Sequence, residues 1–275
     1  MVSLNEVFER MSEGSCSHVE RICVSMVTNG RARKDTLIIV KRLREKTSSI
    51  SVLIAPSIVN KEWLCELKKA GAEKVGIAID AATPELFEKL RGNGVKGPHR
   101  WGWCWRIVEE GVEIFGRYDV GVHLIVGLGE TEKEIVETIQ KAYDIGALTH
   151  LFSFFPEEGS SMQYFPQPPI GRYRRVQLAR YLINKGLTTV QEIAFDSEGR
   201  LMDFDIDEGV LDGVISSGLP FMTSGCSSKK RENACNRPFS DCTPYQAYVG
   251  EMRNYPFTPT GGGHQCHKEA AVGLL

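Results

Sequence analysis

The chain of 275 residues is 42% hydrophobic and 25% charged, and its formal net charge is −2. This composition is typical of a globular protein that is long enough to bury a sizeable core. The lack of a basic excess argues against nucleic acid as a partner, and no segment approaches the roughly 18 continuous apolar residues of a membrane span. The N-terminal residues MVSLNEVFERMSEGS lack the apolar stretch of a signal peptide, so we expect a cytoplasmic protein.

The eight cysteines do not indicate a disulfide framework, because the chain is long and apolar enough to fold without one. In a cytoplasmic protein, grouped cysteines are more typical of a metal or catalytic site. Three are grouped near the C-terminus: Cys226, Cys235 and Cys242. The others are scattered, as small buried hydrophobic residues are: Cys16, Cys23, Cys65, Cys104 and Cys266.

Short apolar runs alternate with longer amphipathic segments in the first two thirds of the chain. The apolar runs predict strands at 21–28, 50–56, 74–80, the first part of 120–131, and 148–156. The other segments predict helices at 33–47, 60–72, 83–92, about 101–116, 130–146 and 171–186. Strands buried on both faces and joined by helices indicate a parallel sheet. We therefore predict an α/β fold, a partial (β/α) barrel, with a doubly wound open sheet as the alternative.

The last third of the chain has a different character. Residues 187–206 contain the turn DSEG between two short candidate strands, and a short helix is expected at about 206–216. From residue 217 onward the chain is rich in Gly, Pro, Ser, Asn and Cys, which is typical of a tail folded over a main body. We therefore expect an N-terminal segment (1–18), a partial βα barrel (19–186) and a C-terminal extension (187–275).

The residues that follow the predicted strands are the first candidates for function, because active sites of βα barrels lie at the C-terminal ends of the strands. The third strand ends at Asp80, and the fourth runs into Gly127, Gly129 and Glu130. The glycines permit tight turns and close approach of the backbone to a ligand. Each acid also has a simpler interpretation, as a loop cap or as a favourable charge at a helix N-terminus. His99, in the loop GPHR, is a candidate contact for substrate or cofactor.

The segment LIVGLGETEKEIVETI resembles the fifth-strand region of radical S-adenosylmethionine (SAM) enzymes, close to biotin synthase. The GxIxGxxE pattern of that family is met at Ile125, Gly127 and Glu130, whereas His123 stands at its first glycine. The segment IAIDAATPELFEKL resembles the preceding strand of biotin synthase, whose aspartate contacts the ribose of SAM, and that position is Asp80.

A closer resemblance covers about residues 19–256. The segments GPHRW, VGVHLIVGLGETE, RYRRVQLARYLI, TSGC, CNRP and RNYPF, in this order, resemble the two-protein lipoyl synthases of archaea and anaerobic bacteria. The resemblance implies an enzyme that inserts sulfur into an octanoyl chain attached to a carrier protein, with His99 and His123 as candidate substrate contacts. The SAM site that it implies comprises Asp80, Ile125, Gly127, Glu130 and Phe154.

The resemblance also gives the grouped cysteines a role. RICVSM resembles the strand in which biotin synthase places a cysteine ligand of its auxiliary iron–sulfur cluster, and that position is Cys23. Thiolates on an irregular tail can converge on such a cluster, so we expect the tail to close over the barrel mouth. The implied ligands of an auxiliary [4Fe–4S] cluster are Cys23, Cys226, Cys235 and, as the weakest member, Cys242. The alternatives are thiols without metal or a zinc site, although the spacing fits no common CxxC zinc pattern.

One motif of the family is not in the sequence. Radical SAM enzymes bind a [4Fe–4S] cluster through CxxxCxxC in the loop after the first strand, and no such spacing occurs here. We expect that the first βα unit is missing, because the chain is shortened, is half of a split enzyme, or is a degenerate homologue. A second [4Fe–4S] cluster would then need ligands from a missing segment or from a partner, and we predict no SAM cleavage by this chain alone.

These expectations extend to partners and to the remaining alternatives. The resemblance implies an octanoylated carrier protein, a second radical SAM subunit or paralogue, and an electron donor such as ferredoxin. One alternative is a biotin synthase-like or other radical SAM reaction, although SVLIAP lacks a cysteine that biotin synthase has there. The alternative of another class is a non-catalytic partner subunit that binds a metal or a cluster. The tail sequence HQCH contains His264, Cys266 and His267, for which a tail without metal is the simpler interpretation.

Overall fold

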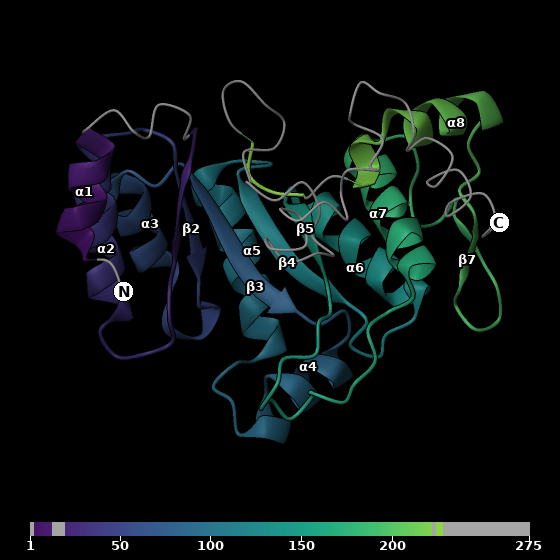
Figure 1. Ribbon diagram of the computed structural model, residues 1–275, viewed down its shortest axis with the longest axis horizontal. Coiled ribbons are helices and arrows are strands. Elements are labelled where there is room, and N and C mark those ends of the chain that lie inside the picture. The colour runs from purple at the N-terminus through teal and green to yellow at the C-terminus, as the bar shows by residue number, and fades with distance from the viewer. Residues whose placement is uncertain (1–2, 13–19, 222–223, 228–275) are drawn as a thin grey trace.

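The computed structural model describes residues 3–12, 20–221 and 224–227. Its centre is a five-stranded sheet of order β1-β2-β3-β4-β5 in which every neighbouring pair is parallel (Figure 1). The strands are β1 (Ile22–Ser25), β2 (Ile50–Ile54), β3 (Lys74–Asp80), β4 (Val120–Val126) and β5 (Leu148–Ser153). A sequential order without reversal is that of a partial βα barrel, and it excludes the doubly wound alternative.

Helices connect and flank these strands. They are α1 (Leu4–Ser12), α2 (Ala32–Arg44), α3 (Lys61–Ala70), α4 (Pro84–Leu90), α5 (Trp101–Phe115), α6 (Glu132–Ile145), α7 (Ile170–Asn184) and α8 (Glu208–Ser217). Short 3₁₀ turns occupy Pro56–Ile58, Asn93–Val95 and Leu219–Phe221. The alternation of strand and helix predicted between residues 21 and 186 is confirmed, whereas α1 was not predicted.

The ends of the elements have local causes. The helix predicted from residue 130 begins at Glu132, because Thr131 is its N-cap and forms a capping box with Glu134. Helix α4 begins in the same way, with Thr83 accepting a hydrogen bond from the backbone N–H of Leu86. The first and last strands of the sheet are shorter than predicted, ending at Ser25 and Ser153.

The two faces of the sheet differ in what covers them. Helix α5 packs on β3 and β4, where its Gly111 lies against Val120 and Ile77. Because side chains alternate along a strand, the intervening residues Gly121 and His123 point to the opposite face. That face is called the open face below, since it lies away from the helices.

The C-terminal extension adds a hairpin and a helix to the α6–α7 side of the sheet (Figure 1). Strands β6 (Ala194–Phe195) and β7 (Leu201–Asp203) pair antiparallel around the predicted turn. Leu201, Phe204 and Phe221 are buried in the same apolar cluster as the barrel residues. At the other end of the sheet, the N-terminal helix α1 contacts α2 through a hydrogen bond of 3.1 Å from Arg42 to Asn5.

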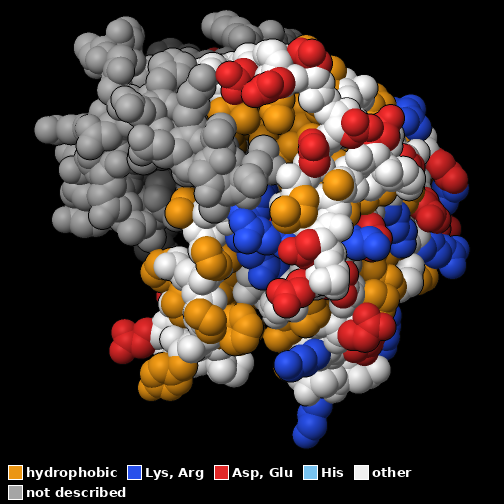
Figure 2. Space-filling model, turned by 90° about the vertical axis from the view of Figure 1, so that its right-hand side faces the viewer, with side chains coloured by type: hydrophobic (Ala, Val, Ile, Leu, Met, Phe, Trp, Pro, Cys, Tyr) orange, Lys and Arg blue, Asp and Glu red, His pale blue; other side chains and the backbone are white. Residues whose placement is uncertain are grey.

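The surface is mixed in character. On the face turned to the viewer in Figure 2, acidic and basic side chains are interspersed with hydrophobic ones. Among the described residues, no helix has the length and apolarity that crossing a membrane requires.

Candidate functional site

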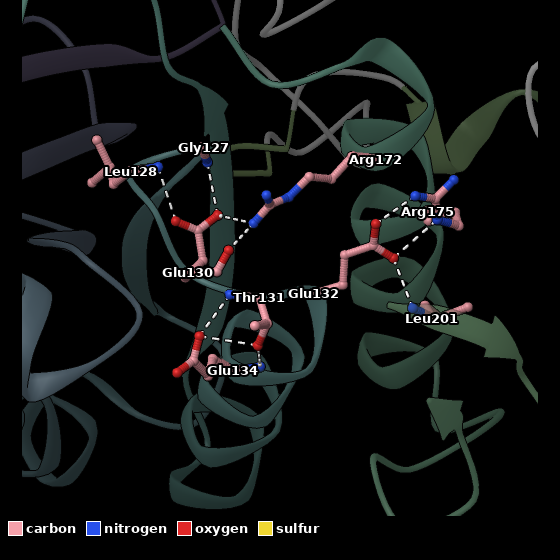
Figure 3. Close-up of polar contacts among 9 residues, drawn as sticks. All are labelled: Gly127, Leu128, Glu130, Thr131, Glu132, Glu134, Arg172, Arg175 and Leu201. Carbon is pink, nitrogen blue, oxygen red and sulfur yellow. Dashed lines mark hydrogen bonds and ion pairs between the residues drawn. The ribbon is translucent and has the colours of Figure 1, made fainter. Parts of the chain in front are cut away.

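The loop after β4 is built around the side chain of Glu130. This carboxylate is fully buried, and it accepts hydrogen bonds from the backbone N–H groups of Gly127 (2.7 Å) and Leu128 (2.9 Å) (Figure 3). Arg172, on α7, donates to the same carboxylate at 3.0 Å and to the backbone carbonyl of Glu130. Glu130 therefore shapes the loop, and its carboxylate is buried away from solvent.

The glycines of this loop are required by its geometry. Gly127 has φ +102°, and a Cβ there would lie 2.7 Å from Cδ of Pro168. Gly129 has φ +119°, a conformation that other residues adopt only with strain. The loop thus presents backbone rather than side chains at the end of β4, as the sequence predicted from its glycines.

A second buried ion pair lies beside the first (Figure 3). Arg175, one turn further along α7, donates to both carboxylate oxygens of Glu132, at 2.9 and 2.5 Å. The same carboxylate accepts a hydrogen bond of 2.9 Å from the backbone N–H of Leu201 in β7. The start of α6, the first turns of α7 and the hairpin are therefore connected through one carboxylate.

The end of β3 positions Asp80 in an unusual conformation. Its φ is +66°, and the pairing of β3 with β4 shifts register between Ala78 and Asp80. Arg91 forms an ion pair with the Asp80 carboxylate and donates to the carbonyl of Ala78 at 2.7 Å. Burial raises the pKa of Asp80, and the Arg91 guanidinium opposes that rise. A strained acid at a strand end is a feature that recurs in binding sites.

His99 joins this group, so two residues singled out from the sequence lie next to one another. Its Nε2 lies 3.4 Å from the Arg91 guanidinium, and its buried Nδ1 has no hydrogen-bond partner within the described part of the chain. Burial lowers the pKa of His99, and the Arg91 charge acts in the same direction.

The remaining predicted SAM contacts lie on β4 and just after β5. Ile125 is half-buried and alternates onto the open face, paired in register with Phe152. Phe154 is 8% exposed and packs edge-on against Phe165, with ring centroids 5.7 Å apart. Asp80, Ile125, Gly127 and Phe154 thus all lie toward the C-terminal ends of neighbouring strands.

The tail residues that the structure describes lie elsewhere than expected. Ser224 accepts a hydrogen bond of 2.8 Å from the backbone N–H of Leu151 on the edge strand β5. The carbonyl of Ser227 accepts one of 2.8 Å from Arg21, just before β1. Cys226 lines a pocket with residues at the N-terminal ends of β3, β4 and β5. The described tail therefore runs across the N-terminal ends of the strands, not over the C-terminal mouth.

The structure describes only some of the proposed cluster ligands. Cys23 is exposed near the start of β1, and Cys226 is half-buried. Because Arg21 contacts Ser227, the segments that carry these two cysteines meet. Outside the described residues lie Cys235 and Cys242, together with Cys16, His264, Cys266 and His267. Of the scattered cysteines, Cys104 is buried as expected and Cys65 is half-buried, and burial raises the pKa of Cys104 to about 11.

Two histidines lie side by side on the open face. His123 and His150 are paired in register on β4 and β5, and their rings are 5.3 Å apart. Burial lowers the pKa of His123 to about 4 and that of His150 to about 3. Gly76 and Gly121 make room for them, since a Cβ would lie 3.0 Å from Nε2 of His123 and 2.2 Å from Nε2 of His150 respectively.

Comparison with known proteins establishes the superfamily to which the chain belongs. The family model of the radical SAM superfamily matches residues 1–142, more than half of the chain, and the chain belongs to this superfamily. Membership implies SAM and a [4Fe–4S] cluster as cofactors, and it supports catalysis in general. No curated protein matches the sequence significantly.

Two solved structures share the fold. Methylornithine synthase (PylB) is similar with a TM-score of 0.55 at 12% identity, over 68% of this chain and 54% of that one. HydG, a maturase of the [FeFe]-hydrogenase, is similar with a TM-score of 0.57 at 14% identity, over 68% of this chain and 44% of that one. The chain thus spans about half the length of these neighbours, and at such low identity the likeness concerns the fold alone.

The SAM-cleaving cluster does not fit the residues that are present. The sequence has no CxxxCxxC motif, and the described residues contain no group of three Cys, His, Asp or Glu side chains that could hold a metal ion. We therefore derive no step of SAM cleavage from this chain.

Sequence reasoning did not identify Arg91, Arg172, Arg175 or His150. Arg172 and Arg175 lie on α7, where a basic residue usually faces solvent, and Arg91 directly follows α4. The partners of all three are distant in the sequence. His150 had an available signal, because a glycine inside a strand often marks a close approach by another group. Gly121 is such a glycine, and the ring of His150 lies against it.

Proposed function

We propose that this chain binds SAM at the C-terminal ends of β3, β4 and β5 and takes part in radical SAM sulfur insertion of the lipoyl synthase type. The acceptor would be an octanoyl chain attached to a carrier protein. In this proposal Asp80 contacts the ribose, and Ile125, Gly127, Glu130 and Phe154 complete the SAM site. Glu130 supports the backbone at Gly127 and Leu128 through the two N–H groups it accepts from.

An auxiliary [4Fe–4S] cluster would supply the sulfur. The proposed ligands are Cys23, Cys226 and Cys235, with Cys242 the weakest member. The observation that carries this part is the hydrogen bond from Arg21 to Ser227, because it brings the tail at Cys226 to the strand that carries Cys23. Arg21 and Lys74 also lie there, each in an ion pair with a carboxylate, Glu73 and Asp119 respectively.

The SAM-cleaving cluster would come from elsewhere. We propose that a second radical SAM subunit, a paralogue, or a further segment of the protein supplies its CxxxCxxC ligands, with an electron donor such as ferredoxin. Substrate contacts would include His99 and His123, and burial lowers the pKa of each.

Anaerobic reconstitution of the full chain with iron and sulfide tests this proposal. About four irons per chain and a broad visible absorbance, both lost in Cys226→Ala and Cys235→Ala, are expected. Cys65→Ala is the matched control, since Cys65 is half-buried on α3 and outside the proposed ligand set. A colourless protein, or a cluster that survives both ligand substitutions, would contradict sulfur insertion.

The second candidate is a non-catalytic subunit that binds a metal or cluster. The absence of CxxxCxxC from the sequence favours it. In the same experiment, one zinc and no visible absorbance would support this candidate. Product analysis with the carrier-bound octanoyl chain distinguishes the first proposal from biotin synthase-like sulfur insertion, which acts on another substrate.

A further inference from the structure

The carboxylate at the end of β3 has one oxygen that no group of the described chain occupies. The Arg91 guanidinium pairs with Oδ2 of Asp80, whereas Oδ1 has no hydrogen-bond partner among the described residues. The Asp80 side chain is 25% exposed, although its neighbours Ile79 and Ala81 are fully buried. The strand end therefore presents one carboxylate oxygen that is open to a ligand.

The backbone that carries this carboxylate is irregular, and Arg91 spans the irregularity. Asp80 has φ +66°, and the pairing of β3 with β4 shifts register between Ala78 and Asp80. One nitrogen of Arg91, Nη1, donates both to the Ala78 carbonyl, at 2.7 Å, and to the Asp80 carboxylate. A left-handed conformation at a residue other than glycine is strained and persists only where its surroundings hold it. Arg91 is the side chain that connects the two sides of this shift.

Arg91 is itself held in place. It directly follows α4, whose Phe87 is fully buried and packs edge-on against Trp101, with ring centroids 5.5 Å apart. The backbone N–H of Arg91 donates to the Phe87 carbonyl at 2.8 Å. The following loop folds back closely, because a Cβ at Gly97 would clash with the Arg91 carbonyl oxygen. The guanidinium thus extends toward β3 from a well-packed support, which is what orienting another side chain requires.

The other polar neighbour of Arg91 does not compete for its charge. Nη2 lies 3.4 Å from Nε2 of His99, and a guanidinium can only donate, so this ring nitrogen accepts. Among the described residues, Asp80 is the only carboxylate that pairs with Arg91. The thiol of Cys104 is the other titratable group whose charge interacts with both residues, and burial keeps its pKa high.

We propose that Arg91 is a positioning residue for SAM: by holding Oδ2 of Asp80 and the Ala78 carbonyl, it directs Oδ1 of Asp80 toward the ribose hydroxyl groups. The inference rests on the proposed function and deepens it, since it gives a residue outside the implied SAM site a role in forming that site. Arg91 needs no contact with SAM for this role. Its charge also lowers the pKa of Asp80 against the effect of burial, which favours the ionised carboxylate as the acceptor.

Equilibrium dialysis of the full chain against SAM at several pH values tests this role. Arg91→Gln should weaken SAM binding about tenfold or more at about pH 6, the effect of one hydrogen bond to a charged group. The loss should be smaller at about pH 8, because the pKa of Asp80 rises without the guanidinium and a protonated carboxyl is the poorer acceptor. The ionisation of SAM itself is common to all the proteins compared.

Lys89→Gln is the matched control. Lys89 is exposed in the last turn of α4, so the substitution removes the same charge near the site without touching Asp80. Since exposed charges are screened by salt, SAM affinity should stay within about twofold of the wild type at every pH. An equal weakening in Lys89→Gln and Arg91→Gln would show that only the net charge matters, and it would overturn the positioning role.

A double-mutant cycle separates positioning from general damage to the fold. In an Asp80→Asn background, Arg91→Gln should cause little further loss of SAM affinity, because Arg91 acts through Asp80. Arg91→Lys keeps the charge without the planar fork, so it should retain the wild-type pH profile with weaker binding, and it serves if Arg91→Gln does not fold. Equal losses in both backgrounds, or wild-type affinity in Arg91→Gln at every pH, would overturn the inference while the SAM site stands. A wild-type chain that does not bind SAM would contradict both.

Discussion

The two ends of the central sheet differ in their ion pairs, although each end buries a histidine nitrogen without a partner among the described residues: Nδ1 of His99 at the C-terminal ends and Nδ1 of His150 at the N-terminal ends. At the C-terminal ends, each buried carboxylate has partners: Glu130 has two backbone N–H groups and Arg172, Glu132 has Arg175, and Asp80 has Arg91. At the N-terminal ends, the buried side chain of His150 has a nitrogen without a partner. A thiol lies in the same pocket.

The ion pairs at the C-terminal ends preorganise the loops that follow β3 and β4. The C-terminal ends hold their loop geometry through groups of this chain, so a ligand there would find backbone already in place. Both ends also bury a histidine nitrogen that the described residues leave unsatisfied, which is costly unless another group bonds to it. Substitutions at the C-terminal ends should therefore cause large losses of stability, whereas substitutions at the N-terminal ends should change the metal content of the protein.

The largest expected effect on stability is that of Glu130→Ala. It removes the acceptor of two backbone hydrogen bonds and leaves Arg172 without its carboxylate, so we expect a loss of about 3–5 kcal/mol in the free energy of unfolding. Urea denaturation measures it. The control is Glu137→Ala, whose exposed contact with Lys133 is 3.9 Å long and should contribute less than about 0.5 kcal/mol. Similar losses in the two variants would contradict a structural role for Glu130.

Arg175→Ala should cost nearly as much, about 3 kcal/mol. It leaves the buried Glu132 carboxylate with one partner among the described residues, the backbone N–H of Leu201 at 2.9 Å. The hairpin depends on that carboxylate, so amide exchange across β6 and β7 should accelerate more than exchange in β2. Uniform acceleration across the whole sheet would instead indicate that the ion pair does not act on the hairpin.

Gly127→Ala should cost about 2 kcal/mol, since it combines a strained φ of +102° with a contact of 2.7 Å to Pro168. Gly159→Ala is the matched control: its φ is +79°, and a Cβ there meets nothing within 4 Å. It should cost about 1 kcal/mol, from backbone strain alone. Equal losses of stability in thermal denaturation would show that Pro168 moves aside to accommodate the added methyl group. The loop would then not require glycine at position 127.

The smallest expected effect is a pH dependence of the protein's stability that arises from Asp80. Burial raises its pKa in the folded state, so its contribution to stability is greatest below the unfolded-state pKa and declines as the pH rises through the folded value. Asp80→Asn cannot ionise, and it should therefore gain stability relative to the wild type between about pH 3 and pH 7. Unfolding curves across this range measure the difference. A relative loss over the same range would mean that the Arg91 ion pair outweighs burial.

Much of the fold was predictable because its signals are local. Apolar runs such as 50–56 and 74–80 predicted β2 and β3, and the capped segment after Thr83 predicted α4. The candidate site was predictable in part, since the glycines and Glu130 follow β4 directly. The role of the Glu130 side chain in the loop could not be predicted from the sequence, because its partner Arg172 lies 42 residues away along the chain.

The tail was the least predictable part. Its sequence has no periodicity, so nothing local indicates whether it runs over the C-terminal or the N-terminal ends of the strands. Its path depends on single long-range hydrogen bonds, from Leu151 to Ser224 and from Arg21 to Ser227. Such single hydrogen bonds between distant residues cannot be recognised from a pattern in one amino-acid sequence.

The most direct test of the SAM site is hydrogen–deuterium exchange of the full chain with and without SAM. SAM should slow exchange in peptides that contain residues 79–82 and 127–131, at the ends of β3 and β4, and leave the peptide that contains Leu148 and Thr149 unchanged. Unaltered exchange at both strand ends, or protection confined to the opposite end of the sheet, would contradict a SAM site formed by Asp80, Ile125 and Gly127.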